Sequence, residues 1–269
     1  MRMKRTLTVI LALLSVFSLF GCSAEKIKEE LRPTTTAIPT VRVMFPEGST
    51  VSEIAALLEQ NGVCAAADFM AAVNAPEGDY YFIEGIENPE ERPFLLEGYV
   101  FPDTYEFYFD MTPQAVLKKF LDNFESKITQ ADFDRAAELG YTLDEVIRIA
   151  SIIQEEALDA EMKKVSSVLH NRLDSAYGKL ECDVTVFYLR NSVEPYVEDI
   201  SVYSELYNAY KRVGLPAGPI TNVGRNAIEA ALYPEDTDYY FFLTDKDMNY
   251  HYAVTWKEHS ANVDKYIED

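Results

Sequence analysis

Residues 150–157, Ala-Ser-Ile-Ile-Gln-Glu-Glu-Ala, place a carboxylate on the apolar face of a predicted helix. Thr142 and Glu145 have the spacing of a capping box, so the helix is expected to begin at Thr142. Apolar residues then recur at helical spacing, and Glu156 falls inside their stripe, three residues after Ile153. Burial raises a carboxyl pKa by penalising the charged form, so such an acid can donate a proton near neutral pH.

A second interpretation of Glu156 involves no chemistry. A Glu near the end of a helix can extend to water or form an ion pair with Lys163 or Lys164. Helix geometry alone leaves both interpretations open. The neighbouring Glu155 is rotated by roughly 100° toward solvent, so it is the weaker candidate for a general acid.

Residue types that serve metal or nucleic-acid binding are sparse. The three histidines show no metal-ligand spacing with one another or with cysteine, so we expect neither a metal nor a cofactor. Cys64 and Cys182 lie in different predicted domains, which favours two free thiols, although an exported protein could pair them. The formal charge is 24 − 45 = −21, and such an acidic surface repels nucleic acid.

Residues 1–21 have the features of an export signal. Basic residues precede an apolar run from Leu7 to Phe20, which is shorter than the roughly 20 residues that span a bilayer. Cys22 follows a small residue at the end of this run, an arrangement that resembles the bacterial lipobox, in which this cysteine carries a lipid. Ordinary signal cleavage nearby is the alternative. Removing residues 1–21 would change the charge to 21 − 45 = −24.

Composition divides the rest of the chain. Residues 22–40 are polar and rich in Thr and Pro, which predicts a flexible tether. Residues 41–75 are expected to form a small module of one strand and two helices. Residues 76–94 contain prolines and are interpreted as a connection with a short strand. Residues 95–269 are expected to form a larger domain.

The larger domain begins with helices and ends with strands. The predicted helices cover residues 112–124, 131–139, 142–156 and 161–173. The predicted strands, rich in Val, Tyr and Phe, cover residues 183–189, 239–243 and 250–255. Helices first and strands later favour the α+β fold class.

The order of several motifs resembles that of the endolytic murein transglycosylases, the YceG-like family of bacterial cell-wall enzymes. The resemblance extends from about Val41 to the end of the sequence. It rests on Leu96-Glu97-Gly98-Tyr99-Val100-Phe101-Pro102-Asp103-Thr104-Tyr105, Ala150-Ser151-Ile152-Ile153 with Glu156, Asn171-Arg172-Leu173, Asp183 with Thr185-Val186, Tyr207-Asn208, Gly214-Leu215-Pro216, Gly218-Pro219-Ile220, Asn222, Gly224, His251, Thr255 and Glu258-His259.

This resemblance implies a reaction and an acid. The family's Ala-Ser-Ile motif carries a single catalytic Glu, and the matching residue is Glu156, while Gln154 occupies an adjacent family position that is often acidic. The implied substrate is the glycan strand of peptidoglycan, cut without water to leave a 1,6-anhydro end, so that nascent strands are terminated or trimmed. The resemblance also implies a LysM-like fold for residues 41–75, which either binds sugar or only packs on its neighbour.

Further residues are expected to line the glycan groove or to hold Glu156 in place. They are Glu97, Asn171, Arg172, Asp183, Thr185, Tyr207, Asn208 and His251. Arg172 has an alternative role as an ion-pair partner of Asp183 or Glu97, and Asn208 one in closing a turn. His251 and His259 either contact the peptide stem or are structural. Trp256, the only tryptophan, is expected to pack in the core, with stacking on a sugar as the alternative.

The chain also departs from the family pattern. Val184 and Val223 stand where the family usually has Pro, and Tyr250 stands where it has Gly. Cys22 replaces the usual transmembrane helix, which predicts a lipid-anchored protein at the outer face of the cytoplasmic membrane. Cell-wall synthesis proteins are its expected partners besides glycan. Two alternatives remain: a water-using muramidase with Asp183 as second carboxylate, and a weakly active or inactive scaffold that binds peptidoglycan.

Overall fold

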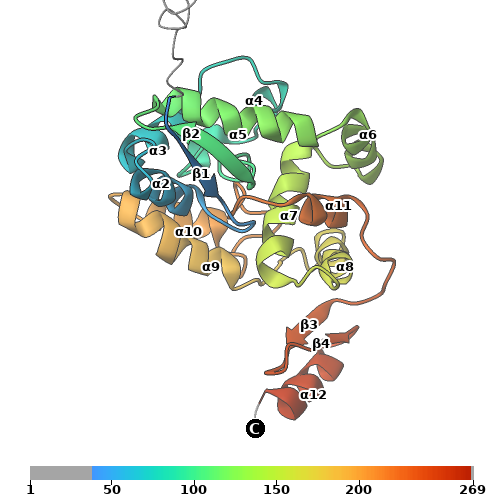
Figure 1. Ribbon diagram of the computed structural model, residues 1–269. Coiled ribbons are helices and arrows are strands. Elements are labelled where there is room, and N and C mark those ends of the chain that lie inside the picture. The colour runs from blue at the N-terminus through green and yellow to red at the C-terminus, as the bar shows by residue number, and fades with distance from the viewer. Residues whose placement is uncertain (1–37, 268–269) are drawn as a thin grey trace, which may run out of the picture. The chain divides into compact units, whose positions relative to one another are not determined.

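Helices dominate the structure, and its strands form two separate antiparallel ribbons (Figure 1). The computed structural model describes residues 38–267, so the predicted export signal, Cys22 and most of the predicted tether lie outside the described residues. Helices with separate antiparallel strands agree with the predicted α+β class. The elements are β1 (Thr40–Met44), α2 (Val51–Gln60), α3 (Ala66–Asn74), α4 (Tyr81–Glu84), η1 (Pro89–Glu91), β2 (Thr104–Tyr108), α5 (Pro113–Lys127), α6 (Gln130–Leu139), α7 (Leu143–Glu156), α8 (Met162–Leu173), α9 (Val184–Tyr188), η2 (Leu189–Val193), η3 (Glu194–Tyr196), α10 (Ser201–Tyr207), α11 (Arg225–Leu232), β3 (Phe241–Thr244), β4 (Tyr250–Ala253) and α12 (Trp256–Tyr266).

The first ribbon joins segments that are distant in the sequence. β1 pairs antiparallel with β2, with Val43 opposite Tyr105, and the buried rings of Phe45 and Phe107 meet edge to face beneath it. From Thr40 onward the described residues belong to one compact unit. β1 therefore pairs with a strand that follows the predicted connection in the sequence. The LysM-like fold and the predicted domain boundaries stay predictions. Within residues 38–267, no helix is both long and apolar enough to span a bilayer.

The predicted connection contains helical turns where a short strand was expected. Residues 81–84 form α4 and residues 89–91 form η1, so the expectation of a strand is wrong. Phe82 is buried and stacks on Tyr99, with 5.7 Å between ring centroids and 6° between planes. The buried ring of Phe82 anchors α4, whereas η1 has no buried residue.

The helix that carries Glu156 forms as predicted. Thr142 Oγ1 accepts a hydrogen bond from the Glu145 amide at 3.2 Å, and the Glu145 carboxylate accepts one from the Thr142 amide at 2.8 Å. This capping box satisfies two amides that lack partners within the helix. The apolar stripe of α7 is buried against α8 and α11, so the acid at its end is held by a fixed core helix.

Residues 183–189 form a helix, so the predicted strand is wrong. The segment is α9, which runs directly into the π-helical turn η2. Its buried side chains are Thr185, Tyr188 and Leu189, at helical spacing, while Asp183 and Phe187 are exposed. Val and Thr favour strands in general, but tertiary packing of one helical face overrides that preference here.

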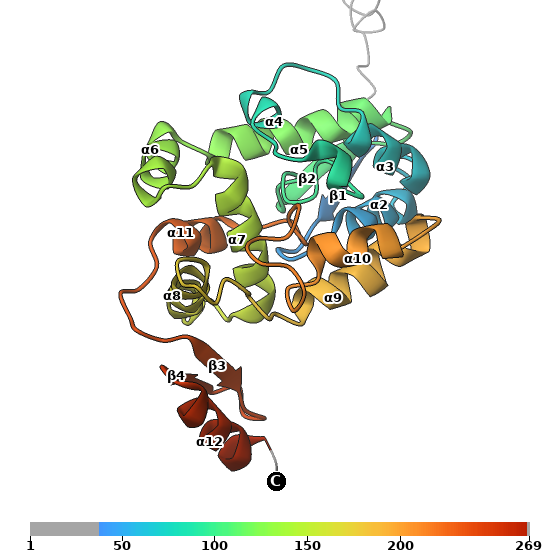
Figure 2. The same cartoon turned by 180° about the vertical axis from the view of Figure 1, so that it is seen from behind.

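The second ribbon is a hairpin followed by a helix. β3 and β4 pair with Leu243 opposite His251, close to the two strands predicted there. The hairpin and α12 lie beside each other, and β3 contacts α8 (Figures 1 and 2). α12 begins with a capping box in which Thr255 Oγ1 accepts from the Glu258 amide at 3.3 Å. This box fixes the position of Trp256, the first residue of α12.

Candidate active site

Glu156 is the last residue of α7, and its half-buried side chain lines a cavity of about 530 Å³. α8 contributes Arg172 to the wall, and the loop before α9 contributes residues 180–183. β3 and α12 contribute Phe241 and Trp256. Segments from distant parts of the chain therefore meet around one carboxyl group, as in an enzyme site.

The surroundings of Glu156 raise its pKa to about 7. Burial is the largest cause, because the charged form loses solvation, and the negative charge of Asp183 is the second. Glu155 adds a smaller increase, while a hydrogen bond with Cys182 and the positive charge of Arg172 oppose the shift. Near neutral pH a substantial fraction of Glu156 is therefore protonated, as a general acid requires.

The alternative role of Glu156 as a lysine partner is not observed. Lys163 pairs with Glu229 at 3.0 Å, and Lys164 pairs with Glu161 at 3.4 Å. Among residues 38–267, no lysine or arginine nitrogen lies within ion-pair distance of the Glu156 carboxylate. Its proton affinity is therefore set by burial and by more distant charges.

The β3–β4 hairpin is attached to the end of α7. The Tyr250 hydroxyl donates to the Glu156 carbonyl oxygen at 3.0 Å and accepts from the Leu158 amide at 3.1 Å. A carbonyl in the last turn of a helix has no partner within the helix, so this contact satisfies it. Tyr250 thus fixes the backbone of the candidate acid.

Arg172 and Asn171 hold the segment that leads into this hairpin. Arg172 Nε donates to the Tyr240 carbonyl at 2.6 Å, and Asn171 Nδ2 donates to the carbonyls of Thr237 and Tyr239 at 2.8 and 2.9 Å. Arg172 lines the cavity, whereas Asn171 does not. Within the described residues, the predicted ion pair of Arg172 with Asp183 or Glu97 is not formed.

Thr185 and Asn208 support the part of the wall that contains Cys182 and Tyr210. Thr185 is buried, and its hydroxyl donates to the Cys182 carbonyl at 2.9 Å and accepts from the Ala209 amide at 3.2 Å. Asn208 Oδ1 accepts a hydrogen bond from the Tyr210 amide at 2.9 Å. This contact closes a turn, as the alternative prediction for Asn208 had it. Both residues therefore position backbone that carries cavity residues.

Asp183 is exposed and lines the cavity together with Glu156. Its carboxylate accepts a hydrogen bond from the Tyr210 hydroxyl at 2.8 Å. Of the predicted binding residues, Asp183 and Arg172 are the two that share the cavity with the candidate acid.

Glu97 lies in a different environment. It is only 1 % exposed, and its carboxyl group accepts from the Val51 amide at 2.9 Å, Asn222 Nδ2 at 2.8 Å and the Tyr188 hydroxyl at 3.4 Å. Burial raises its pKa to about 8, and these hydrogen bonds oppose the shift. Glu97 does not line the Glu156 cavity and joins α2 to the loop that carries Asn222.

Tyr207 and His251 also lie outside the cavity. Tyr207 is buried with its ring 5.6 Å from that of Tyr188. His251 Nε2 is 2.8 Å from Asp245 Oδ2, and its ring stacks on Tyr266. Contact of Glu97, Tyr207 or His251 with glycan stays a prediction that the geometry does not favour. Cys22 lies outside the described residues.

Sequence reasoning missed part of the cavity wall. Trp256, expected in the core, is 66 % exposed and lines the cavity, so that expectation is wrong. The spacing of Thr255 and Glu258, which predicts a helix start, could have placed Trp256 on a helix end. Cys182 is buried next to Glu156, and it and Cys64 are free thiols, as predicted.

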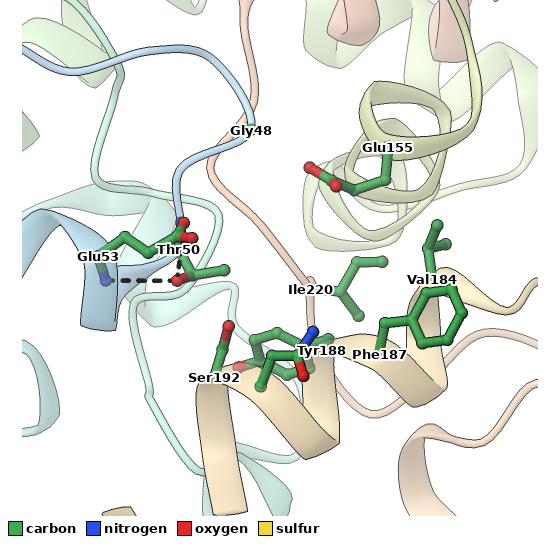
Figure 3. Close-up of a pocket in the computed structure, with 10 residues that line it drawn as sticks. Gly48, Thr50, Glu53, Glu155, Val184, Phe187, Tyr188, Ser192 and Ile220 are labelled. Atoms are coloured by element: carbon green, nitrogen blue, oxygen red, sulfur yellow. Dashed lines mark hydrogen bonds between the residues drawn. The ribbon is translucent and has the colours of Figure 1, made fainter. Parts of the chain in front are cut away.

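A smaller cavity of about 160 Å³ adjoins the next residue of α7 (Figure 3). Glu155 projects from the end of α7 toward the loop that carries Gly48, and Thr50, Val184 and Ile220 also line this space. Consecutive residues of α7 and of the start of α9 thus border two separate cavities. Residues 38–267 contain no cluster of His, Cys, Asp and Glu that could hold a metal ion.

The sequence of this chain is similar to those of two named bacterial proteins. The chain is 30% identical over 243 residues to a Bacillus subtilis (strain 168) protein named endolytic murein transglycosylase, covering 84% of this chain and 65% of that protein. A Streptococcus pneumoniae (strain D39) protein of the same name is 25% identical over 182 residues, which cover 65% of this chain and 33% of that protein. The chain thus spans less than two thirds of the length of these relatives.

A solved structure agrees with these sequence matches. The crystal structure of a yceG-like protein from Listeria monocytogenes has a TM-score of 0.67 and 27% identity, covering 88% of this chain and 80% of that one. Residues 20–265 match the profile of the YceG-like family. Because this match includes most of the sequence, the chain belongs to the YceG-like family.

Proposed function

We propose that this chain is an endolytic lytic transglycosylase that cuts the β-1,4 glycan strands of peptidoglycan, with Glu156 as its acid and base. The observation that carries the proposal is a carboxyl group with a pKa of about 7 at the wall of an open cavity. The names of the two relatives support the substrate class. No cofactor is needed for this reaction.

The mechanism requires one group that first donates and then accepts a proton. Protonated Glu156 gives its proton to the bridging oxygen, and the bond between that oxygen and C1 breaks as positive charge develops at C1. The C6 hydroxyl of the same sugar forms a bond to C1 and returns its proton to Glu156. The product is a 1,6-anhydro sugar, and no water is consumed. Because the nucleophile belongs to the reacting sugar, no second carboxylate has to activate it.

Asp183 has two roles in this proposal. Its charge raises the pKa of Glu156, and it faces the same cavity, where it can stabilise positive charge at C1. Arg172 limits the rise in pKa and holds the hairpin in place.

The position of Asp183 also favours a second candidate function. In a water-using muramidase, this carboxylate would activate water while Glu156 donates the proton. Mass spectrometry of glycan fragments separates the two reactions, because hydrolysis adds one water and the anhydro route adds none.

The test compares two adjacent carboxylates of α7. Glu156→Gln is expected to release no detectable anhydro-ended fragments from purified peptidoglycan under conditions in which wild type does. Glu155 borders the other cavity, and Glu155→Gln is expected to keep activity within a few-fold. Retained cleavage by Glu156→Gln would remove Glu156 from the mechanism. A wild-type protein that binds glycan but never cuts it would favour a scaffold.

The setting of the enzyme is part of the proposal. We place it at the outer face of the cytoplasmic membrane, held by a lipid on Cys22, where it terminates or trims nascent strands beside cell-wall synthesis proteins. A LysM-like module that contains residues 41–75 would add affinity for glycan. Membrane fractionation of wild type and Cys22→Ala tests the anchor, because loss of the lipid should release the protein.

A further inference from the structure

Trp256 is the most exposed aromatic side chain of the described residues. It is 66 % exposed, whereas the next, Tyr196, is 48 % exposed. A large apolar ring in contact with water is unfavourable, and exposed apolar surface in a cavity commonly marks a binding site. Trp256 lines the same cavity as Glu156.

The Trp256 ring is held in place by its neighbours. It meets Phe241 edge to face, with 5.8 Å between centroids and 65° between planes, and lies 5.5 Å from the ring of His259. Phe241 in turn stacks on His259 at 5.2 Å and 23°. Packing through one edge fixes the ring while most of its surface remains open, so a ligand would not have to order it.

The same aromatic wall is connected to the candidate acid. The Arg172 guanidinium lies 5.2 Å from the centroid of the Phe241 ring, and it also donates a hydrogen bond to the Tyr240 carbonyl oxygen. On the other strand of the hairpin, the Tyr250 hydroxyl donates a hydrogen bond to the Glu156 carbonyl oxygen. Movement of the wall relative to the acid would break these contacts.

We propose that Trp256, supported by Phe241, is a stacking platform that orients a glycan strand across Glu156. A sugar ring has C–H faces that fit an aromatic ring and polar edges that need hydrogen bonds. The cavity supplies polar groups for those edges from Arg172, Asp183 and Tyr210. This inference rests on the proposed function, because it takes glycan as the ligand, but it assigns a positioning role to a residue outside the family motifs.

The only tryptophan of the chain makes the binding test direct. In the Glu156→Gln background, uncross-linked glycan strands should shift and saturably change the tryptophan emission, because stacking removes the ring from water. Co-sedimentation of the same strands measures binding independently. Strands that bind without a change in emission would overturn the platform, and so would an absence of binding.

Kinetics provide the second test. Trp256→Ala should raise the KM for glycan strands by about tenfold, as expected for loss of one well-packed aromatic contact, with a smaller change in kcat. Trp256→Phe should recover most of this loss. Tyr196→Ala, an exposed aromatic outside both cavities, should leave KM unchanged. An unchanged KM in Trp256→Ala, or a Phe variant as poor as Ala, would contradict the proposal.

A structural effect gives a different result. If Trp256→Ala only disturbed the hairpin, Arg172 and Tyr250 would lose their contacts and the pH dependence of kcat would move, whereas loss of a platform leaves it in place. Retained cleavage by Glu156→Gln would refute the proposed acid but not the platform, because the emission test does not depend on cleavage. The two proposals can therefore fail separately.

Discussion

Burial raises the pKa of the side-chain carboxyl group in both Glu97 and Glu156, yet the surroundings of the two residues differ. Glu97 is 1 % exposed and accepts hydrogen bonds from three protein groups, while Glu156 lines a cavity of about 530 Å³. Burial raises the first pKa to about 8 and the second to about 7. A raised pKa is thus shared by both groups, and access to the larger cavity distinguishes Glu156 from Glu97 as the group that can meet a substrate.

The largest expected difference between the two sites is in catalysis. Glu156→Gln should lower kcat by about 10² to 10⁴-fold, the usual contribution of a positioned general acid, without lowering the thermal unfolding midpoint. Rates of anhydro-end formation and a melting curve on the same sample measure both. A comparable loss of kcat in Glu97→Gln, with its fold intact, would remove the distinction.

The reverse pattern is expected when Glu97 is truncated. Glu97→Ala leaves the Val51 amide and Asn222 Nδ2 without their acceptor, and should cost about 3 kcal/mol of unfolding free energy. Activity per folded molecule should stay within a few-fold. Urea unfolding and an activity assay at matched folded concentration test this. Normal stability of Glu97→Ala would contradict the structural role.

The pH dependence of activity sharpens the description of Glu156. Because the protonated form donates, kcat/KM should fall as pH rises through about 7. Asp183→Asn removes a charge that raises this pKa, so the falling limb should move to lower pH. Asp199→Asn serves as the control, because Asp199 is exposed and does not line the cavity of Glu156. A limb that stays in place in Asp183→Asn would show that the two groups do not interact.

The pH dependence of stability should also separate the two groups. In the folded protein the pKa values of both carboxyl groups lie above the ordinary value of 4.5. The contribution of each group to the free energy of unfolding is therefore complete below about pH 4.5 and is lost as the pH rises through its folded pKa. In Glu156→Gln, the free energy of unfolding should fall less steeply between about pH 4.5 and 7 than in wild type. In Glu97→Gln, it should fall less steeply between about pH 4.5 and 8. Chemical unfolding at several pH values measures the difference, and identical profiles would contradict it.

Local patterns predicted the helix that carries the candidate acid. The box of Thr142 and Glu145 and the apolar stripe of α7 are encoded within a few turns, so they identified Glu156 and its side of the helix. The same holds for the strands of the hairpin, where Tyr and Phe are concentrated.

Features that depend on distant contacts were missed. Residues 183–189 have β-branched side chains, but burial of Thr185 and Tyr188 on one face makes them helical. Trp256 was assigned to the core because large aromatic residues are usually buried, and the sequence does not reveal that a cavity lies beside α12. Similarly, nothing near Glu97 in the sequence shows that Val51 and Asn222 enclose it.

The bond from the Tyr250 hydroxyl to the Glu156 carbonyl also has a consequence for the order of folding. A chain in which only the segments up to α11 have folded already contains the acid, but not the strands that complete its surroundings. The carboxyl group would then be more hydrated and ionised at neutral pH, and a poor proton donor. Docking of the hairpin on α7 is therefore the folding step that gives the Glu156 carboxyl group its raised pKa.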